Sequence, residues 1–133
     1  MFNVLVIDND LSIYQFLKAK LIEHNISKPL FYFAKDFHEA KLIKDTEKID
    51  LILVDIHLSG MNGIKIIEKT NQLLPGIPVI IFTDFNDEDL ALECIKHGAQ
   101  DYILKSSINI KSLIKSLKLS ITRYQKMISS QTA

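Results

Sequence analysis

Five short apolar runs, spaced along the chain, constrain the fold more than any other feature of the sequence. Polar and apolar residues do not alternate cleanly within them, which is typical of parallel strands covered on both faces. Segments with the apolar spacing of helices separate the runs. The pattern predicts a single doubly wound α/β domain with a five-stranded parallel sheet. The runs are rich in Val, Ile, Leu, Phe and Tyr and span residues 3–8, 30–34, 50–55, 78–83 and 101–105.

The intervening segments carry signals for helix starts and ends. Ile13, Leu17 and Leu21 lie on one helical face, and Asp36 followed by Glu39 is typical of a capped helix start. We expect helices at about 11–24, at about 36–47, around Ile64, Ile67, Leu73 and Leu74 up to Pro75-Gly76, from a cap at Asn86 and Asp89 to Gly98, and from Asn109 to Ser129.

Length and composition place the chain among ordinary soluble domains. It has 133 residues, of which 47% are hydrophobic and 24% charged, enough for one domain with its own core. The single cysteine, Cys94, rules out an internal disulfide, and we expect it to pack as a small apolar residue. No apolar stretch approaches a membrane span, and no signal peptide precedes the first run. A cytoplasmic location is the expectation.

The net charge of zero hides an asymmetry along the chain. Residues 106–133 carry five basic side chains and no acidic one, so residues 1–105 hold the other 11 basic and all 16 acidic side chains. A basic helix of this kind could touch nucleic acid or a membrane surface, but it is more often a solvated face. No aromatic residues suited to base stacking are interleaved with the charges. We therefore expect no direct contact with nucleic acid or membrane.

Polar groups follow four of the apolar runs at the point where each ends. Asp8-Asn9-Asp10 follow the first run, Asp55 ends the third, Thr83 ends the fourth and Lys105 ends the fifth. In an open parallel sheet, ligands bind at the carboxyl ends of the strands. We therefore expect these side chains to converge on one site.

The chemistry of this set favours a divalent cation and a phosphoryl group. Asp8, Asn9 and Asp55 offer the oxygen ligands that Mg²⁺ prefers, and the backbone carbonyl of His57 could complete the shell. A carboxylate such as Asp55 can accept a phosphoryl group, and Lys105 and the Thr83 hydroxyl would stabilise the charge that develops on it. Asp10 could instead cap the helix that follows.

Four sequence motifs, in order and spacing, resemble the receiver domain of two-component response regulators over residues 2 to about 122. They are VLVIDND, DLILVDIHLSGMNG, PVIIFT and HGAQDYILK. The resemblance implies a flavodoxin-like (βα)₅ fold of the CheY type, with Asp55 as phosphoacceptor and Asp8 binding Mg²⁺. It implies that Thr83 and Lys105 contact the phosphoryl group. It also places Tyr102 where the family carries its switch aromatic.

The chain departs from the family pattern beside the acceptor. Asn9 stands where the family usually has a second acidic residue, so we expect weaker Mg²⁺ binding. Ser106 replaces the proline that commonly follows the lysine. A cis bond without proline would cost about 3 kcal/mol, so we expect a trans bond or an altered loop.

The resemblance also implies partners and a domain boundary. A sensor histidine kinase or a phosphotransfer protein would be the phosphodonor, and the chain would act as a switch rather than an enzyme beyond its own phosphorylation and dephosphorylation. We expect a receiver domain over residues 1–124, with 125–133 completing the last helix and starting a possible linker. Output would pass to a protein partner or to an effector domain absent from this sequence. Ile121, Tyr124 and Ile128 extend the apolar stripe of the last helix, which also allows a homodimer through these helices.

Two other functions fit parts of the pattern. A receiver-like module that binds proteins without phosphorylation is one, because Asn9 thins the metal side of the site. A haloacid dehalogenase-type phosphohydrolase is the other, because Ile7-Asp8-Asn9-Asp10 fits its first motif. That enzyme class needs a further acidic pair after the lysine, and no acidic residue follows Lys105.

Overall fold

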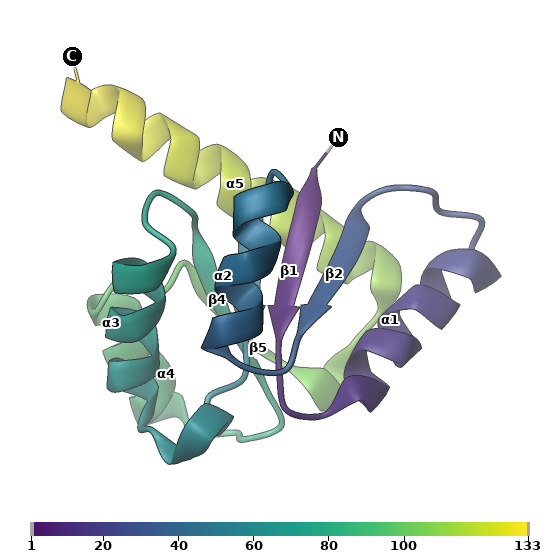
Figure 1. The fold of residues 1–133 in the computed structure, drawn as a ribbon, viewed down its shortest axis with the longest axis horizontal. Helices are drawn as coiled ribbons and strands as arrows, with labels where there is room; N and C mark the ends of the chain where they lie inside the picture. The colour runs from purple at the N-terminus through teal and green to yellow at the C-terminus, as the bar shows by residue number, and fades with distance from the viewer. Residues whose placement is uncertain (1, 133) are drawn as a thin grey trace.

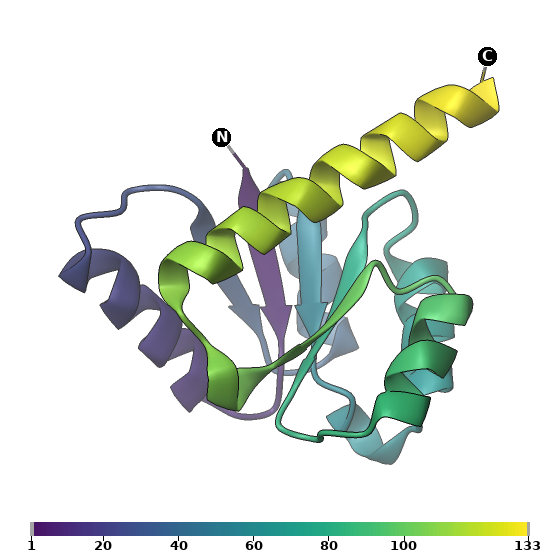
Figure 2. The same ribbon diagram turned by 180° about the vertical axis from the view of Figure 1, so that it is seen from behind.

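The computed structural model describes residues 2–132 as a five-stranded parallel sheet with helices on both faces (Figures 1 and 2). The strand order is β2-β1-β3-β4-β5, which confirms the fold class expected from the sequence. The regular elements, in chain order, are β1 (Asn3–Ile7), α1 (Leu11–Glu23), β2 (Leu30–Ala34), α2 (Phe37–Thr46), β3 (Leu51–Val54), a 3₁₀ turn (Leu58–Gly60), α3 (Gly63–Leu73), β4 (Val79–Thr83), α4 (Glu88–Lys96), β5 (Asp101–Leu104), a second 3₁₀ turn (Lys105–Ser107) and α5 (Ile110–Thr132).

Two apolar cores explain why the strands lack alternation. Leu5 and Ile7 of β1 face the core beneath α2, α3 and α4. Their neighbours Val4 and Val6 face the core beneath α1 and α5. All four side chains are at most 1% exposed, because successive residues of a strand point to opposite faces and both faces are covered. The strand ends therefore remain the places for polar side chains.

Most helix boundaries lie within a few residues of those expected, and the start of α4 is a correction. Asp87 is its N-cap and accepts a hydrogen bond from the Leu90 amide at 3.0 Å. The expected caps were Asn86 and Asp89; Asn86 lies before the cap and Asp89 in the first turn. In the helix that follows, Cys94 is buried in the core and Leu90 is half-buried against it.

The last helix is longer than the sheet that it covers. Ile110, Leu113, Ile114 and Leu117 are buried in the core shared with α1. Beyond them α5 leaves the domain past the amino ends of the strands, as Figure 2 shows. Ile121 and Tyr124 are half-buried there and Ile128 is exposed. None of the helices within residues 2–132 is long and apolar enough to cross a membrane.

Candidate functional site at the carboxyl edge of the sheet

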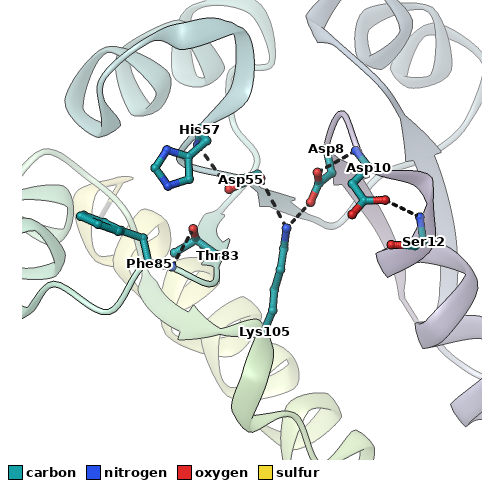
Figure 3. Close-up of polar contacts among 8 residues, drawn as sticks. All are labelled: Asp8, Asp10, Ser12, Asp55, His57, Thr83, Phe85 and Lys105. Atoms are coloured by element: carbon teal, nitrogen blue, oxygen red, sulfur yellow. Dashed lines mark hydrogen bonds and ion pairs between the residues drawn. The ribbon is translucent and has the colours of Figure 1, made fainter.

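The parallel register brings the expected side chains together. Asp8 and Asp55 are the first residues after β1 and β3, which pair directly, with Ile7 opposite Val54. The Asp55 amide donates to the Ile7 carbonyl at 3.1 Å and fixes this junction. Thr83 ends β4 beside β3, and Lys105 follows β5 at the sheet edge. Figure 3 shows their side chains gathered at one edge of the sheet.

The ammonium group of Lys105 lies between two carboxylates. Its Nζ is 2.5 Å from Asp8 Oδ2 and 3.4 Å from Asp55 Oδ2. Asp8 is 1% exposed and Asp55 8% exposed, while the Lys105 side chain is 12% exposed. One positive charge thus faces two negative charges in a partly dehydrated pocket. The excess negative charge favours a cation.

Backbone amides fix the two carboxylates. Asp8 Oδ1 accepts from the Asp10 amide at 2.9 Å, and Asp55 Oδ1 accepts from the His57 amide at 3.2 Å. Asp10 itself caps α1 by accepting from the Ser12 amide at 2.9 Å, so the alternative capping role is confirmed. Asn9 is exposed beside them.

Burial and the ion pair between Asp8 and Lys105 together shift the pKa values of these two residues. Burial raises the pKa of Asp8 above its ordinary value, against the opposing effects of the Lys105 hydrogen bond and the Asp10 amide. For Lys105, burial lowers the pKa. The hydrogen bond to Asp8 and the charges of both carboxylates raise it by more, so the net shift is upward. Lys105 is therefore protonated at neutral pH. The raised pKa of Asp8 means that its charged form is less favourable in the folded state than in the unfolded chain.

A divalent cation fits this edge through carboxylate and carbonyl oxygens with water. Within residues 2–132, no cluster of three or more His, Cys, Asp or Glu side chains could hold a metal ion by itself. Mg²⁺ does not require such a cluster, because it is usually held by one or two carboxylates and keeps several waters. Asp8 and Asp55 supply the carboxylates, and Asn9 and the His57 carbonyl follow them in sequence. The roles of these four residues as ligands stay predictions.

The Phe85 peptide links Thr83 to Tyr102, a connection that the sequence did not reveal. Its amide donates to Thr83 Oγ1 at 3.2 Å. The Tyr102 hydroxyl donates to the Phe85 carbonyl oxygen. Burial raises the Tyr102 pKa, helped by the neighbouring Cys94, Asp87 and Asp55, so this hydroxyl keeps its proton. The half-buried Tyr102 is therefore tied to the loop that follows Thr83.

Two aromatic rings lie on the side of Asp55 away from Asp8. His57 and Phe85 meet edge to face with their ring centroids 5.5 Å apart, and Figure 3 shows both near Asp55 and Thr83. Phe85 is 44% exposed. On the Lys105 side a hollow of about 380 Å³ opens instead, lined by Asp10, Ser12, Ile13, Phe16, Asp84 and Lys105. Aromatic rings therefore lie on one side of Asp55, and a hollow opens on the Lys105 side.

The peptide bond after Lys105 is trans, one of the two outcomes expected from Ser106. The only cis peptide bond within residues 2–132 joins Lys28 to Pro29, so the bond from Lys105 to Ser106 is trans. The chain turns there in the short 3₁₀ segment Lys105–Ser107. The lysine still reaches both carboxylates in this loop geometry.

The sequence matches the response regulator receiver domain family over residues 4–118. It is 35% identical over 104 residues to the transcriptional regulatory protein ZraR of Salmonella typhimurium (strain LT2). It is 31% identical over 122 residues to the DNA-binding transcriptional regulator NtrC of Escherichia coli (strain K12). These alignments cover 77% and 92% of the chain but 23% and 25% of the relatives. The chain thus spans about a quarter of their length.

Solved structures share the whole fold. The signal receiver domain of a putative LuxO repressor protein from Vibrio parahaemolyticus has a TM-score of 0.76 at 25% identity, with 97% of this chain and 96% of that chain covered. The beryllofluoride-activated receiver domain dimer of NtrC4 has a TM-score of 0.75 at 26% identity, with 93% and 99% covered.

The raised pKa of Asp8 predicts how neutralising this residue changes stability. A group whose pKa is higher in the folded state destabilises that state above this pKa, and the effect vanishes below the unfolded-state value. Asp8→Asn should therefore raise the free energy of unfolding at pH 7 in EDTA, and the gain should shrink as the pH falls toward 4. Urea unfolding at several pH values measures it.

Asp10→Asn is the matched control, because its hydrogen bonds to Ser12 lower the pKa of the exposed Asp10. Its carboxylate stabilises the folded state at neutral pH, so this variant should lose stability there, and the loss should also shrink in acid. A destabilised Asp8→Asn at pH 7 would contradict the proposed net cost of the Asp8 charge.

Proposed function

We propose, for a chain that belongs to the response regulator receiver domain family, that Asp55 accepts a phosphoryl group in two-component signal transduction. The observation that carries the proposal is the position of Asp55. Its carboxylate lies at the carboxyl edge of the sheet, 8% exposed, with Lys105 Nζ at 3.4 Å. Phosphorylation would make this chain a signalling switch that turns over no external substrate.

In the transfer step, an Asp55 carboxylate oxygen attacks the phosphorus of the donor. A new O–P bond forms, and the bond from phosphorus to the donor's leaving group breaks, with the electron pair departing on that group. The phosphoryl oxygens then carry negative charge beside Lys105, which is held protonated by its two carboxylate neighbours. The Thr83 hydroxyl can donate to one of these oxygens while still accepting from the Phe85 amide.

We propose that Asp8, Asn9, Asp55 and the His57 backbone carbonyl hold Mg²⁺ at this edge. When bound, the ion neutralises charge on the carboxylates and on the phosphoryl oxygens. The protein's own contribution is orientation, since backbone amides fix Asp8 and Asp55 in place. Asn9 supplies no charge, so the affinity for Mg²⁺ should be low for a site of this kind.

We propose that the phosphodonor is a histidine of a sensor kinase or phosphotransfer protein, approaching through the hollow beside Lys105. That hollow of about 380 Å³ combines apolar Ile13 and Phe16 with polar Asp10 and Asp84, a mixture suited to an imidazole and its helix. On the opposite side of Asp55 lie the rings of His57 and Phe85, which leave less room for a donor.

Output would travel from Thr83 to the surface through the Phe85 peptide and Tyr102. A change in the Thr83 hydrogen bond alters the Phe85 amide, and the Phe85 carbonyl holds the Tyr102 hydroxyl. We propose that Tyr102 reorients on phosphorylation and changes the partner-binding face of α4, β5 and α5. The downstream partner, an effector domain beyond this sequence, the boundary at residue 124 and a cytoplasmic location stay predictions.

A receiver-like module that works without phosphorylation is the second candidate. Asn9 is the observation in its favour, because it removes a carboxylate from the metal side of the site. The intact set of Asp8, Asp55, Thr83 and Lys105 favours the phosphorylated switch. The family match leaves the haloacid dehalogenase interpretation without support.

Phosphorylation can be tested with a small-molecule phosphodonor and Mg²⁺. The wild-type chain should gain the mass of one phosphoryl group in intact-protein mass spectrometry, and Asp55→Asn should not. Asp84→Asn is the matched control, since this exposed carboxylate lines the neighbouring hollow; it should be labelled like the wild type. An unlabelled wild type at millimolar Mg²⁺ would favour the module without phosphorylation.

Restoring the missing charge should strengthen Mg²⁺ binding. A unit charge about 4 Å from a divalent ion contributes about 2 kcal/mol even in water, so Asn9→Asp should lower the Kd for Mg²⁺ at least about tenfold. An NMR titration of backbone amides measures the Kd. Asn71→Asp on α3 adds the same charge away from the site and should leave it unchanged, and equal affinities for Asn9→Asp and wild type would refute this account of Asn9.

Removing the Phe85 ring should shorten the life of the phosphorylated state. The ring packs edge to face on His57, and Figure 3 shows both rings near Asp55 and Thr83. A ring placed there can exclude water, which slows hydrolysis. Phe85→Ala should therefore lose the label several-fold faster in a time course by mass spectrometry. Phe16→Ala, which removes a ring of similar exposure from the opposite hollow, should keep the wild-type rate.

A further inference from the structure

The strand β2 lies at one edge of the sheet, next to α1 (Figure 1). In the sheet formed by the described residues, β1 is its one neighbour. The Ala34 carbonyl accepts from the Asp8 amide at 3.0 Å, so the backbone groups of Ala34 point to the β1 side. Backbone groups alternate in direction along a strand, which places those of Phe31 and Phe33 on the free side. An edge with such groups can pair with another chain.

An apolar hollow of about 190 Å³ opens at the start of this edge, between β2 and the second half of α1. Ile22 on α1 and Leu30 on β2 are 75% and 42% exposed, and no other large apolar side chain within residues 2–132 is as exposed as Ile22. An apolar side chain of a partner would lose contact with water here, which favours binding. The apolar lining consists of Leu21, Ile22, Ile26, Pro29, Leu30 and Phe31.

The charges around the hollow favour an acidic partner. Among the described residues that line it, Lys18 is the one that carries a charge. Lys28 precedes β2 and Lys35 follows it, and all three lysines are exposed. The acidic side chains near the strand are already engaged, Glu23 with Lys20, Glu39 with Lys35 and Glu47 with the Tyr32 hydroxyl. Lys18 and Lys28 are therefore left to attract a negative charge.

The free backbone groups select the form of this partner. A helix satisfies its own N–H and C=O groups, and a lipid chain has none, so neither can pair with Phe31 and Phe33. A second copy of this chain, paired β2 to β2 in antiparallel fashion, would bring Lys28 of one copy beside Lys35 of the other. Lysines on an edge strand counter pairing between identical edges. An extended, acidic segment of a different protein meets none of these objections.

We propose that the free edge of β2 binds an extended segment of a partner protein. The main chain of the segment pairs with Phe31 and Phe33, one apolar side chain enters the hollow beside Ile22, and acidic residues face Lys18 and Lys28. In this mode of recognition, main-chain hydrogen bonds give affinity and the side-chain pocket gives specificity. The strand β5, at the opposite edge of the sheet, carries Tyr102. A partner bound at β2 therefore leaves the face around Tyr102 free.

Hydrogen exchange followed by NMR tests the pairing, with a synthetic peptide of alternating valine and threonine that has aspartates at both ends. At saturating peptide, exchange of the Phe31 and Phe33 amides should slow several-fold, and the Tyr32 amide, which faces β1, should not change. Shifts at Ile22 and Ile26 without this slowing would overturn the proposal, as would unchanged spectra at millimolar peptide. Slowing that appears without peptide and grows with protein concentration would identify a second copy instead and would also overturn it.

Charge reversal tests the acidic character of the partner. Lys18→Glu with Lys28→Glu should raise the Kd for the labelled peptide, measured by fluorescence anisotropy, about tenfold. Ile22→Asn should weaken binding as well, because it removes the most exposed apolar side chain of the hollow. Lys65→Glu with Lys69→Glu reverses two exposed charges on α3 and should leave the Kd unchanged. Equal effects of the two double variants, with wild-type circular dichroism, would refute a specific contact at β2.

Discussion

The site depends on one ammonium group shared by two buried carboxylates. Lys105 touches Asp8 at 2.5 Å and Asp55 at 3.4 Å in a pocket where all three side chains are nearly enclosed. Burying a charge is costly unless it is paired, so the lysine offsets part of the cost of placing two carboxyl groups there. It leaves one negative charge over. That remaining charge makes the edge attractive to a cation.

The topology of the sheet creates this arrangement from residues far apart in sequence. Asp8 and Lys105 are separated by 97 positions, yet each is the first residue after a strand. Parallel strands end at the same edge, and apolar side chains fill both faces of the sheet up to that edge. Polar groups therefore gather only where the strands stop. Packing of this core fixes the strand ends, and with them the positions of these polar residues.

Sequence reasoning identified the strands and the residues at their ends because full burial on two faces leaves a plain signal, a continuous apolar run. It expected the α4 cap at Asn86 and Asp89 rather than at Asp87, because all three residues are of types suited to capping a helix. It also missed the role of Phe85. The link from Thr83 to Tyr102 runs through the backbone of Phe85. The order of side chains in a sequence does not predict how a peptide group in a loop is oriented.

Asp55 and the last turns of α5 lie at opposite ends of the sheet. Asp55 follows β3 at the carboxyl ends of the strands, and α5 leaves past their amino ends, as Figures 1 and 2 show. The buried part of α5, from Ile110 to Leu117, lies between them and is packed against the core. A densely packed core changes little on a small rearrangement at its edge. A rearrangement around Asp55 should therefore act on the face around Tyr102 rather than on the last turns of α5.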